Sequence, residues 1–217
     1  MEISITVVYA GDTNLVASTS NAVSLSFAKD TPKITLTASP ANTSSYGQAI
    51  TFSVALVAQA SGSTDVPAGT VQFFDGAVSL GTATVDGFGF AALSLSGTAS
   101  LPVGSHTITA VYSGNTDFNP VTSTSLTYAV TPATNAVAIA VSSSRNPSVY
   151  GDAVTLIIVV SSSVGATPTG SVSIVDHAVT LGTATLDGTG TATYALPLLT
   201  AGPHTITVTY SGDNNYN

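Results

Sequence analysis

Two linked stretches decide the fold: Gly69-Thr70-Val71-Gln72-Phe73-Phe74-Asp75 and, after a gap of four residues, Leu80-Gly81-Thr82-Ala83-Thr84-Val85-Asp86-Gly87. Both return almost unchanged as Gly170-Ser171-Val172-Ser173-Ile174-Val175-Asp176 and Leu181-Gly182-Thr183-Ala184-Thr185-Leu186-Asp187-Gly188, an offset of 101 from Gly69 to Gly170. A match of this length at a fixed spacing indicates an internal repeat. The 217-residue chain therefore contains at least two copies of one folding unit of about 100 residues.

The repeat extends in both directions from these stretches. Upstream, Tyr46-Gly47-Gln48-Ala49-Ile50-Thr51 matches Tyr150-Gly151-Asp152-Ala153-Val154-Thr155, and downstream His106-Thr107-Ile108-Thr109 matches His204-Thr205-Ile206-Thr207. The offset changes from 104 at Tyr46 to 98 at His106. Loops tolerate such insertions and deletions at little cost, so the drift places them between strands.

A third, partial copy lies at the N-terminus. The loop Tyr9-Ala10-Gly11-Asp12-Thr13-Asn14 matches Tyr112–Asp117 and Tyr210–Asn215. Thr31-Pro32 and Thr131-Pro132 each follow a strand-like run and are interpreted as short linkers, which the fixed φ of proline stiffens.

Each unit shows alternation of apolar and polar residues with turn signals every eight to twelve residues or so, which is typical of a β-sandwich. Asp86-Gly87 and Asp187-Gly188 lie between alternating runs and predict tight hairpin turns. The expected strands, lettered A, B, C, C′, D, E, F and G, span about residues 33–38, 49–58, 70–75, 77–80, 81–86, 88–95, 105–113 and 121–130. The fold class is therefore all-β, with tandem immunoglobulin-like Greek-key sandwiches.

The chain resembles the bacterial immunoglobulin-like repeats of the third group. The residues that carry the resemblance in the first full unit are Tyr46–Phe52, Gly69–Gly76, Gly104–Thr109 and Tyr112–Phe118. The second unit has the same motifs, with Asp152 in place of Gln48 and His177 in place of Gly76. The resemblance implies a stalk, spacer or adhesive module of a large secreted or surface-attached bacterial protein, and it carries over no catalytic or ligand position.

The predicted repeat boundaries do not coincide with the ends of the chain. Residues 1–30 are interpreted as the F–G hairpin of a preceding truncated repeat plus a linker, residues 31–130 as a complete domain, and residues 131–217 as a domain without its last strand. An unpaired F strand exposes backbone donors and acceptors. Two accounts stay open: the chain is a slice of a longer array, or the segment Ser18–Phe27 adds as the missing strand to another copy, head to tail.

Composition excludes several classes of function. Charged residues make up 6% of the chain, the net charge is −8, and Lys29, Lys33 and Arg145 are the only cations. Nucleic-acid binding and docking on anionic lipid both need basic clusters, so neither is expected. No apolar stretch reaches the roughly 18 residues of a membrane span. Without cysteine, disulfides and thiol redox chemistry are excluded.

Histidine is the residue best suited to acid–base chemistry near neutral pH. His106 and His204 occupy equivalent repeat positions, with no Ser, Cys or paired carboxylate fixed nearby in sequence. We therefore predict a structural role, with each ring hydrogen-bonded locally. His177 replaces a glycine in an expected turn and should be exposed to solvent.

Asp12 and Asp213 lie in Gly-Asp-x-Asn loops, where a short acidic side chain bonds its own backbone two residues on. One Asp and one or two Asn per loop offer few of the six to eight oxygens that Ca²⁺ requires, and Asn115 replaces the Asp in the first full unit. A Lys–Asn crosslink would need a buried lysine, for which Lys33 is the candidate in strand A.

Phe74, Phe88 and Phe90 have Val175, Thr189 and Thr191 as their repeat partners. Local variation of the core is the favoured interpretation, and an apolar contact patch formed by Phe74 and Phe88 is the alternative.

We expect no catalytic, cofactor-binding or metal-ligating residue and no enzymatic activity. The expected location is extracellular or on the cell surface. The expected partners are neighbouring repeats or another copy of the chain, joined through Ser18–Phe27. A glycan or a cell-surface receptor is the alternative partner.

Overall fold

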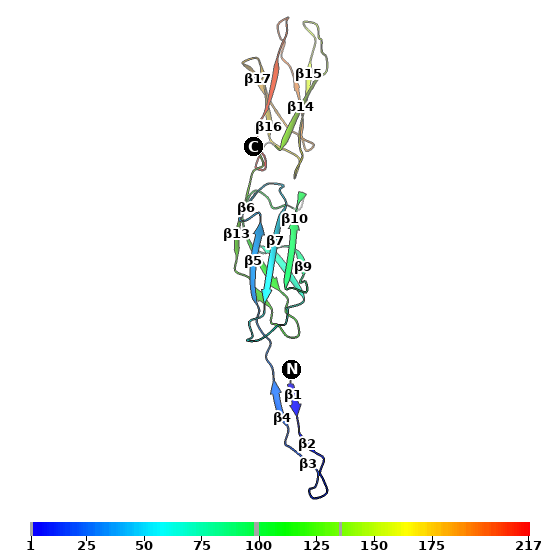
Figure 1. The fold of residues 1–217 in the computed structure, drawn as a ribbon. Helices are drawn as coiled ribbons and strands as arrows, with labels where there is room; N and C mark the ends of the chain where they lie inside the picture. The colour runs from blue at the N-terminus through cyan, green and yellow to red at the C-terminus, as the bar shows by residue number, and fades with distance from the viewer. Residues whose placement is uncertain (1, 98–99, 135) are drawn as a thin grey trace.

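The computed structural model describes residues 2–97, 100–134 and 136–217, and these residues form β-strands and loops. Figure 1 shows three parts strung one after another: an N-terminal hairpin, a first sandwich and a second sandwich. The all-β prediction is confirmed. Two separate hydrophobic clusters, one in each sandwich, form the cores.

The first sandwich consists of two sheets. One has the strand order β10-β7-β5, and the other has the order β6-β13-β11-β8-β9, with β12 paired to β11. The strands are β5 (Lys33–Ser39), β6 (Thr43–Ser45), β7 (Ile50–Val57), β8 (Thr70–Asp75), β9 (Val78–Thr84), β10 (Phe90–Leu95), β11 (Gly104–Tyr112), β12 (Val121–Thr122) and β13 (Leu126–Thr131).

Side-chain alternation places the core where the sequence predicts it. Along β7, Ile50, Phe52, Val54 and Leu56 are buried and the residues between them are half-buried. The aromatic ring of Tyr128 from β13 meets Phe52 edge-on, with the ring centroids 5.5 Å apart. The two sheets therefore close on one apolar layer, as expected for a sandwich.

The predicted C′ and D strands are one strand, and the predicted Asp-Gly hairpins are wrong. β9 pairs with β8 throughout, across a register shift between Phe73 and Phe74, whereas β10 pairs with β7 in the other sheet. The loop at Asp86 therefore crosses between sheets. Its positive φ angle of 84° falls on Gly89, and the Asp86 carboxylate accepts hydrogen bonds from the backbone of Phe88 and Phe90.

The first strand of the sandwich changes sheet, which the sequence analysis did not foresee. β5 pairs with β7 in one sheet, and β6 runs parallel to β13 in the other. Pro40 lies between them and has no N–H to continue the ladder. The strand therefore breaks at Pro40 and its second half covers the edge of β13.

The second sandwich repeats this plan with sheets β14-β15-β18 and β17-β16-β19. Its strands are β14 (Val137–Ser143), β15 (Thr155–Ser162), β16 (Ser171–Asp176), β17 (Val179–Thr185), β18 (Thr191–Ala195) and β19 (Ile206–Tyr210). Among the described residues, β19 pairs with β16 along one edge and has no strand partner along the other, where β13 borders β11 in the first sandwich.

The N-terminal part is a hairpin without a core of its own. β1 (Glu2–Ile5) pairs with β4 (Val23–Ser26), and β2 (Val8–Tyr9) pairs with β3 (Ser18–Thr19). Its large apolar side chains are exposed on both strands, Phe27 just beyond β4 among them.

Candidate functional site

The joint between the two sandwiches is held by backbone hydrogen bonds. Ala133, in the linker, forms a parallel bridge with Tyr216 at the end of the second sandwich. The N–H of Ala133 donates to the carbonyl of Asn215 at 2.8 Å, and the N–H of Asn217 donates to the carbonyl of Ala133 at 3.1 Å. The linker therefore becomes part of the sandwich that follows it.

The same arrangement joins the N-terminal hairpin to the first sandwich. Asp30 bridges Phe118, the repeat equivalent of Tyr216, and exchanges backbone hydrogen bonds of 2.9 and 2.7 Å with Asp117 and Asn119. The Asp30 carboxylate also accepts hydrogen bonds from the backbone of Gln59 and of Ala60. Two joints built in the same way make this fastening a property of the repeat.

Aromatic side chains add a second contact across the joint of the two sandwiches. Tyr46 of the first sandwich meets Tyr216 of the second with ring centroids 5.6 Å apart and planes at 84°. The N–H of Ala166 donates to the Tyr46 hydroxyl at 3.3 Å. The hydroxyl of the fully buried Tyr216 lies within hydrogen-bond distance of the carbonyls of Val164 and Ala166, to either of which it can donate. The joint therefore has packed rings and satisfied hydroxyl groups.

The Gly-Asp-x-Asn loops form as predicted. In the second sandwich the Asp213 carboxylate accepts hydrogen bonds from the backbone of Asn215 at 2.7 Å and Tyr216 at 2.9 Å, and its other oxygen accepts two from Thr169. Asp12 bonds Asn14 in the same way. The Asp213 carboxylate therefore orders the loop that fastens the linker at Ala133.

Each repeat histidine bonds an aspartate from a neighbouring strand. In the first sandwich the two ring nitrogens of His106 lie 2.7 Å from an Asp75 carboxylate oxygen and 2.8 Å from the carbonyl of Pro102. The contact four residues upstream confirms the predicted local bonding. The sequence analysis missed Asp75, although Asp75 and His106 recur together in both repeats, and that joint recurrence was the available signal.

The corresponding pair in the second sandwich is more exposed. His204 lies 2.6 Å from Asp176 and 2.9 Å from the carbonyl of Thr200. The hydrogen bond to Thr200 and that to Asp176 raise the pKa of His204. Burial would raise the pKa of Asp176, but hydrogen bonds from His204 and His177 outweigh it and lower that pKa. The hydrogen bonds therefore hold the His204 ring in a fixed orientation against Asp176.

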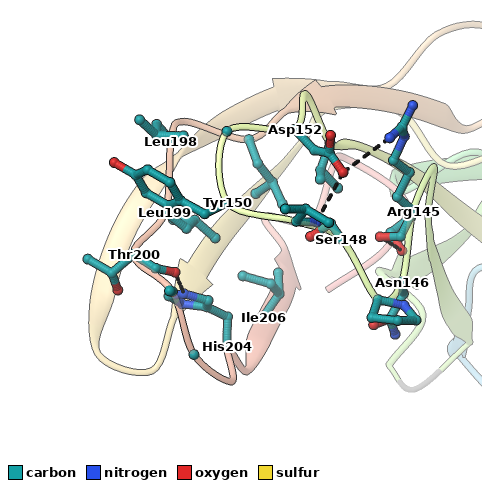
Figure 2. A pocket seen from close by; sticks show the side chains of 18 of the residues that line it. Arg145, Asn146, Ser148, Tyr150, Asp152, Leu198, Leu199, Thr200, His204 and Ile206 are labelled. Atoms are coloured by element: carbon teal, nitrogen blue, oxygen red, sulfur yellow. Dashed lines mark hydrogen bonds and ion pairs between the residues drawn. The ribbon is translucent and has the colours of Figure 1, made fainter.

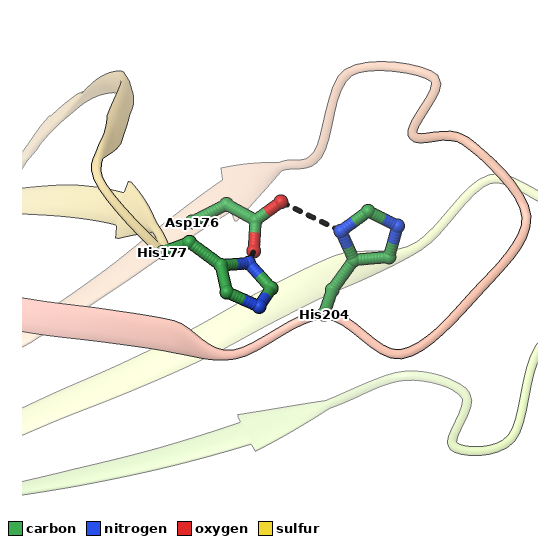
Figure 3. A group of neighbouring side chains, drawn as sticks. All are labelled: Asp176, His177 and His204. Atoms are coloured by element: carbon green, nitrogen blue, oxygen red, sulfur yellow. Dashed lines mark hydrogen bonds and ion pairs between the residues drawn. The ribbon is translucent and has the colours of Figure 1, made fainter.

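His177 lies in a turn and is exposed, as predicted. Its Nδ1 atom also lies 2.8 Å from the second oxygen of Asp176. Figure 3 shows the two imidazole rings on either side of this one carboxylate.

A groove of about 550 Å³ opens along the free edge of the second sandwich, next to β19. Its walls are the segment from Arg145 to Asp152 and the segment from Leu196 to Ile206 (Figure 2), and Leu156 also lines it. Arg145 and Asp152 form an ion pair of 3.1 Å at its rim. In the first sandwich β13 fills the matching position.

The phenylalanines of the first sandwich are not core residues as a group. Phe88 is 82% exposed and Phe90 55% exposed, whereas Phe74 is half-buried. The favoured interpretation of core variation is therefore wrong for Phe88 and Phe90. Phe88 lies in the crossover loop at Asp86, and Phe90 begins β10 on the face opposite the buried Ala91. Lys33 is exposed and does not meet the burial that a Lys–Asn crosslink needs.

The fold and these joints define a class: a tandem immunoglobulin-like repeat protein. Comparison with known families gives the particular family. The model of the bacterial Ig-like domain, group 3, matches residues 36–131 and 141–217, and the chain belongs to that family. The resemblance inferred from the motifs is confirmed. Such a domain is a structural or surface module.

Other comparisons add little. No curated protein matches the chain. Among solved structures, a marsupial T cell receptor matches with 15% identity and a TM-score of 0.35, over 87% of this chain and 100% of that chain. No helix formed by the described residues is long and apolar enough to cross a membrane.

Proposed function

We propose that this chain is a non-enzymatic spacer, part of a stalk in a large bacterial protein of the cell surface or secreted medium. The observation that carries the proposal is the joint. A spacer must hold its two ends at a fixed separation. The linker is hydrogen-bonded to the loop at Asp213, which limits the bending between sandwiches that a free linker would allow. Repeats of this kind contact only their neighbours, so length grows with repeat number.

Solution scattering on the full chain tests the mechanical part of this proposal. A spacer predicts an extended particle whose maximum dimension is unchanged between low and high salt, because few charges cross the joint. A compact particle, with the sandwiches folded side by side, would contradict it. Location is tested separately by treating intact cells of the source bacterium with protease and following the protein with an antibody.

Assembly by strand addition is a second candidate, favoured by the groove beside β19. Leu25 and Phe27 stand at the repeat positions of Tyr128 and Val130, and both of those residues are buried where the second sandwich has its groove. Phe27 is 62% exposed. We propose that the Ser18–Phe27 segment of a second copy occupies the groove and pairs with β19.

Mass in solution tests strand addition. The full chain should form concentration-dependent head-to-tail oligomers, and the double variant Leu25→Ser, Phe27→Ser should remain monomeric. Val16→Ser is a control, because Val16 is also an exposed apolar residue but lies in the hairpin loop. A wild-type chain that stays monomeric at high concentration would sink this candidate.

Adhesion is a third candidate and rests on the exposed ring of Phe88. Exposed aromatic rings are the usual platform for binding a sugar face. A glycan array probed with the full chain should then lose signal in Phe88→Ser. An array without signal for the wild-type chain would remove carbohydrate binding from consideration.

A further inference from the structure

Three side chains that can bind a metal ion converge at one end of the second sandwich. Asp176 ends β16, His177 follows it in the turn, and His204 lies shortly before β19. One candidate ligand atom from each lies within 4.8 Å of the others. The two ring centroids are 6.4 Å apart, with the carboxylate between them (Figure 3).

The first repeat shows which part of this cluster the fold requires. There Asp75 and His106 form the same carboxylate–imidazole pair, but Gly76 stands where the second repeat has His177. The backbone is nearly identical, with φ of 55° at Gly76 and 53° at His177. A glycine adopts this angle without strain, whereas histidine does so at a cost. The turn therefore does not need His177, and a conformational outlier of this kind suggests a function.

The donor set selects a class of metal ion. Two imidazole nitrogens and one carboxylate oxygen suit Zn²⁺, Cu²⁺ or Ni²⁺, whereas Ca²⁺ and Mg²⁺ prefer oxygen donors alone. The second ring nitrogen of His204 lies 2.9 Å from the carbonyl of Thr200. A hydrogen bond of this kind orients a ligating histidine and leaves the opposite nitrogen, here Nδ1, directed at the metal.

The geometry requires only a small adjustment. The Nδ1 atoms of His177 and His204 now lie 2.8 and 2.6 Å from the two oxygens of Asp176. Ligands of a tetrahedral ion with bonds of about 2.0–2.1 Å lie about 3.3 Å apart, so the cluster must open by roughly half an ångström. His177 has an exposed side chain in a turn and can move outward by rotation about its χ angles.

We propose that Asp176, His177 and His204 bind one divalent transition-metal ion, with Zn²⁺ as the expected ion. Three protein ligands leave a fourth position for water or a group from a partner. Binding would tie the β16–β17 turn to the segment that enters β19 and so stabilise the second sandwich by an amount that grows with the logarithm of the free metal concentration.

Calorimetric titration of the full chain with ZnCl₂ in metal-free buffer tests the proposal. One ion should bind per chain, and Co²⁺ in its place should give the visible absorption of a tetrahedral site. His177→Gly restores the turn of the first repeat without strain and should keep the fold. Because it removes a ligand, its affinity should fall by more than the roughly 10–100-fold that loss of an outer-shell partner causes.

The first repeat provides a gain-of-function variant in the same chain. In Gly76→His, a side chain meets no atom within 4 Å of its Cβ and joins Asp75 and His106, so the stoichiometry should rise from one ion to two. A wild-type chain that binds Zn²⁺ no more tightly than His177→Gly would overturn the proposal. An unchanged stoichiometry in Gly76→His would overturn the claim that these three residues suffice.

Discussion

The ring of Tyr46 in the first sandwich meets the ring of Tyr216 in the second edge-on, at a centroid distance of 5.6 Å. Tyr216 is fully buried and its backbone bridges the linker residue Ala133, so this one residue connects the linker with the neighbouring sandwich. The repeat equivalent of Tyr46 is Tyr150, which is 66% exposed. Substituting Tyr46 and Tyr150 in turn therefore distinguishes the contribution of the contact between sandwiches from that of a tyrosine at this repeat position.

We predict that Tyr46→Ala weakens the coupling between the sandwiches. Loss of an edge-on aromatic pair costs about 0.5–1.5 kcal/mol beyond the lost burial, and this energy belongs to the interface between repeats. The second sandwich should therefore unfold at a lower urea concentration, as followed by hydrogen exchange of its β-strand amides. Tyr150→Ala is the matched control and should leave the midpoint unchanged. Equal effects of the two variants would show that the ring pair does not couple the repeats.

The crossover loop predicts opposite outcomes for two neighbouring glycines. Gly89 has φ of 84°, and a Cβ there would lie 2.6 Å from the carbonyl oxygen of Leu56. Gly89→Ala should lower the unfolding free energy by at least about 1–2 kcal/mol. Gly87 has no atom within 4 Å of its Cβ position, so Gly87→Ala should be close to neutral. Thermal unfolding of both variants measures the difference, and a reversed order would refute the loop geometry.

The histidine–aspartate pairs should differ in their contribution to stability. His106 is 7% exposed and bonded through both nitrogens, so His106→Ala removes a buried ring together with both of its hydrogen bonds and should cost about 1–3 kcal/mol. His204 is more exposed, and water can replace its hydrogen bonds in His204→Ala. We expect a smaller loss there, measured by urea unfolding with intrinsic tyrosine fluorescence. A larger loss at His204 would contradict the burial seen in the two repeats.

Acid should destabilise the second sandwich through Asp213. Burial would raise the pKa of this carboxyl, but hydrogen bonds from Thr169, Asn215 and Tyr216 outweigh burial and hold the pKa below its ordinary value of 3.8. Since the folded pKa is the lower one, the stabilisation is complete well above the unfolded pKa and is lost as the pH falls through the folded value. The melting temperature should therefore decrease as the pH is lowered beyond about 4.

Asp213→Asn separates this effect from general acid denaturation. Asn115 occupies the same position in the first repeat and bonds the same two backbone N–H groups, so the loop should form. The variant loses the acceptor for Thr169, with a cost of about 1–2 kcal/mol at neutral pH, and its pH dependence should be shallower. A pH dependence as steep as that of the wild type would assign the acid sensitivity to other groups.

The alternation in β7 and the recurrence at Gly69 and Gly170 were sufficient to predict the all-β fold and most of its strands, because burial on one face fixes both period and register. The same signal did not reveal that β9 and β10 belong to different sheets. An Asp-Gly sequence occurs in crossover loops as well as in hairpin turns. The two are distinguished by strand pairing, here of β9 with β8 and of β10 with β7.

Contacts at the candidate site were likewise predictable only where the partners lie close together in the sequence. Local bonding of Asp213 was predictable because the donors lie two and three residues away. The contact of Asp176 with His204 joins residues 28 positions apart and depends on the pairing of β16 with β19. The convergence of His177 and His204 on the one carboxylate of Asp176 could therefore not be predicted from sequence spacing.

Our central claim is that the joint fixes the two sandwiches relative to each other, and a spin-label distance measurement tests it most directly. The chain has no cysteine, so Val78→Cys and Val179→Cys, both at exposed equivalent positions, can be labelled as a pair. We predict a single narrow distance distribution that broadens when Tyr46→Ala is added. A broad distribution in the chain with Tyr46 intact would contradict the claim.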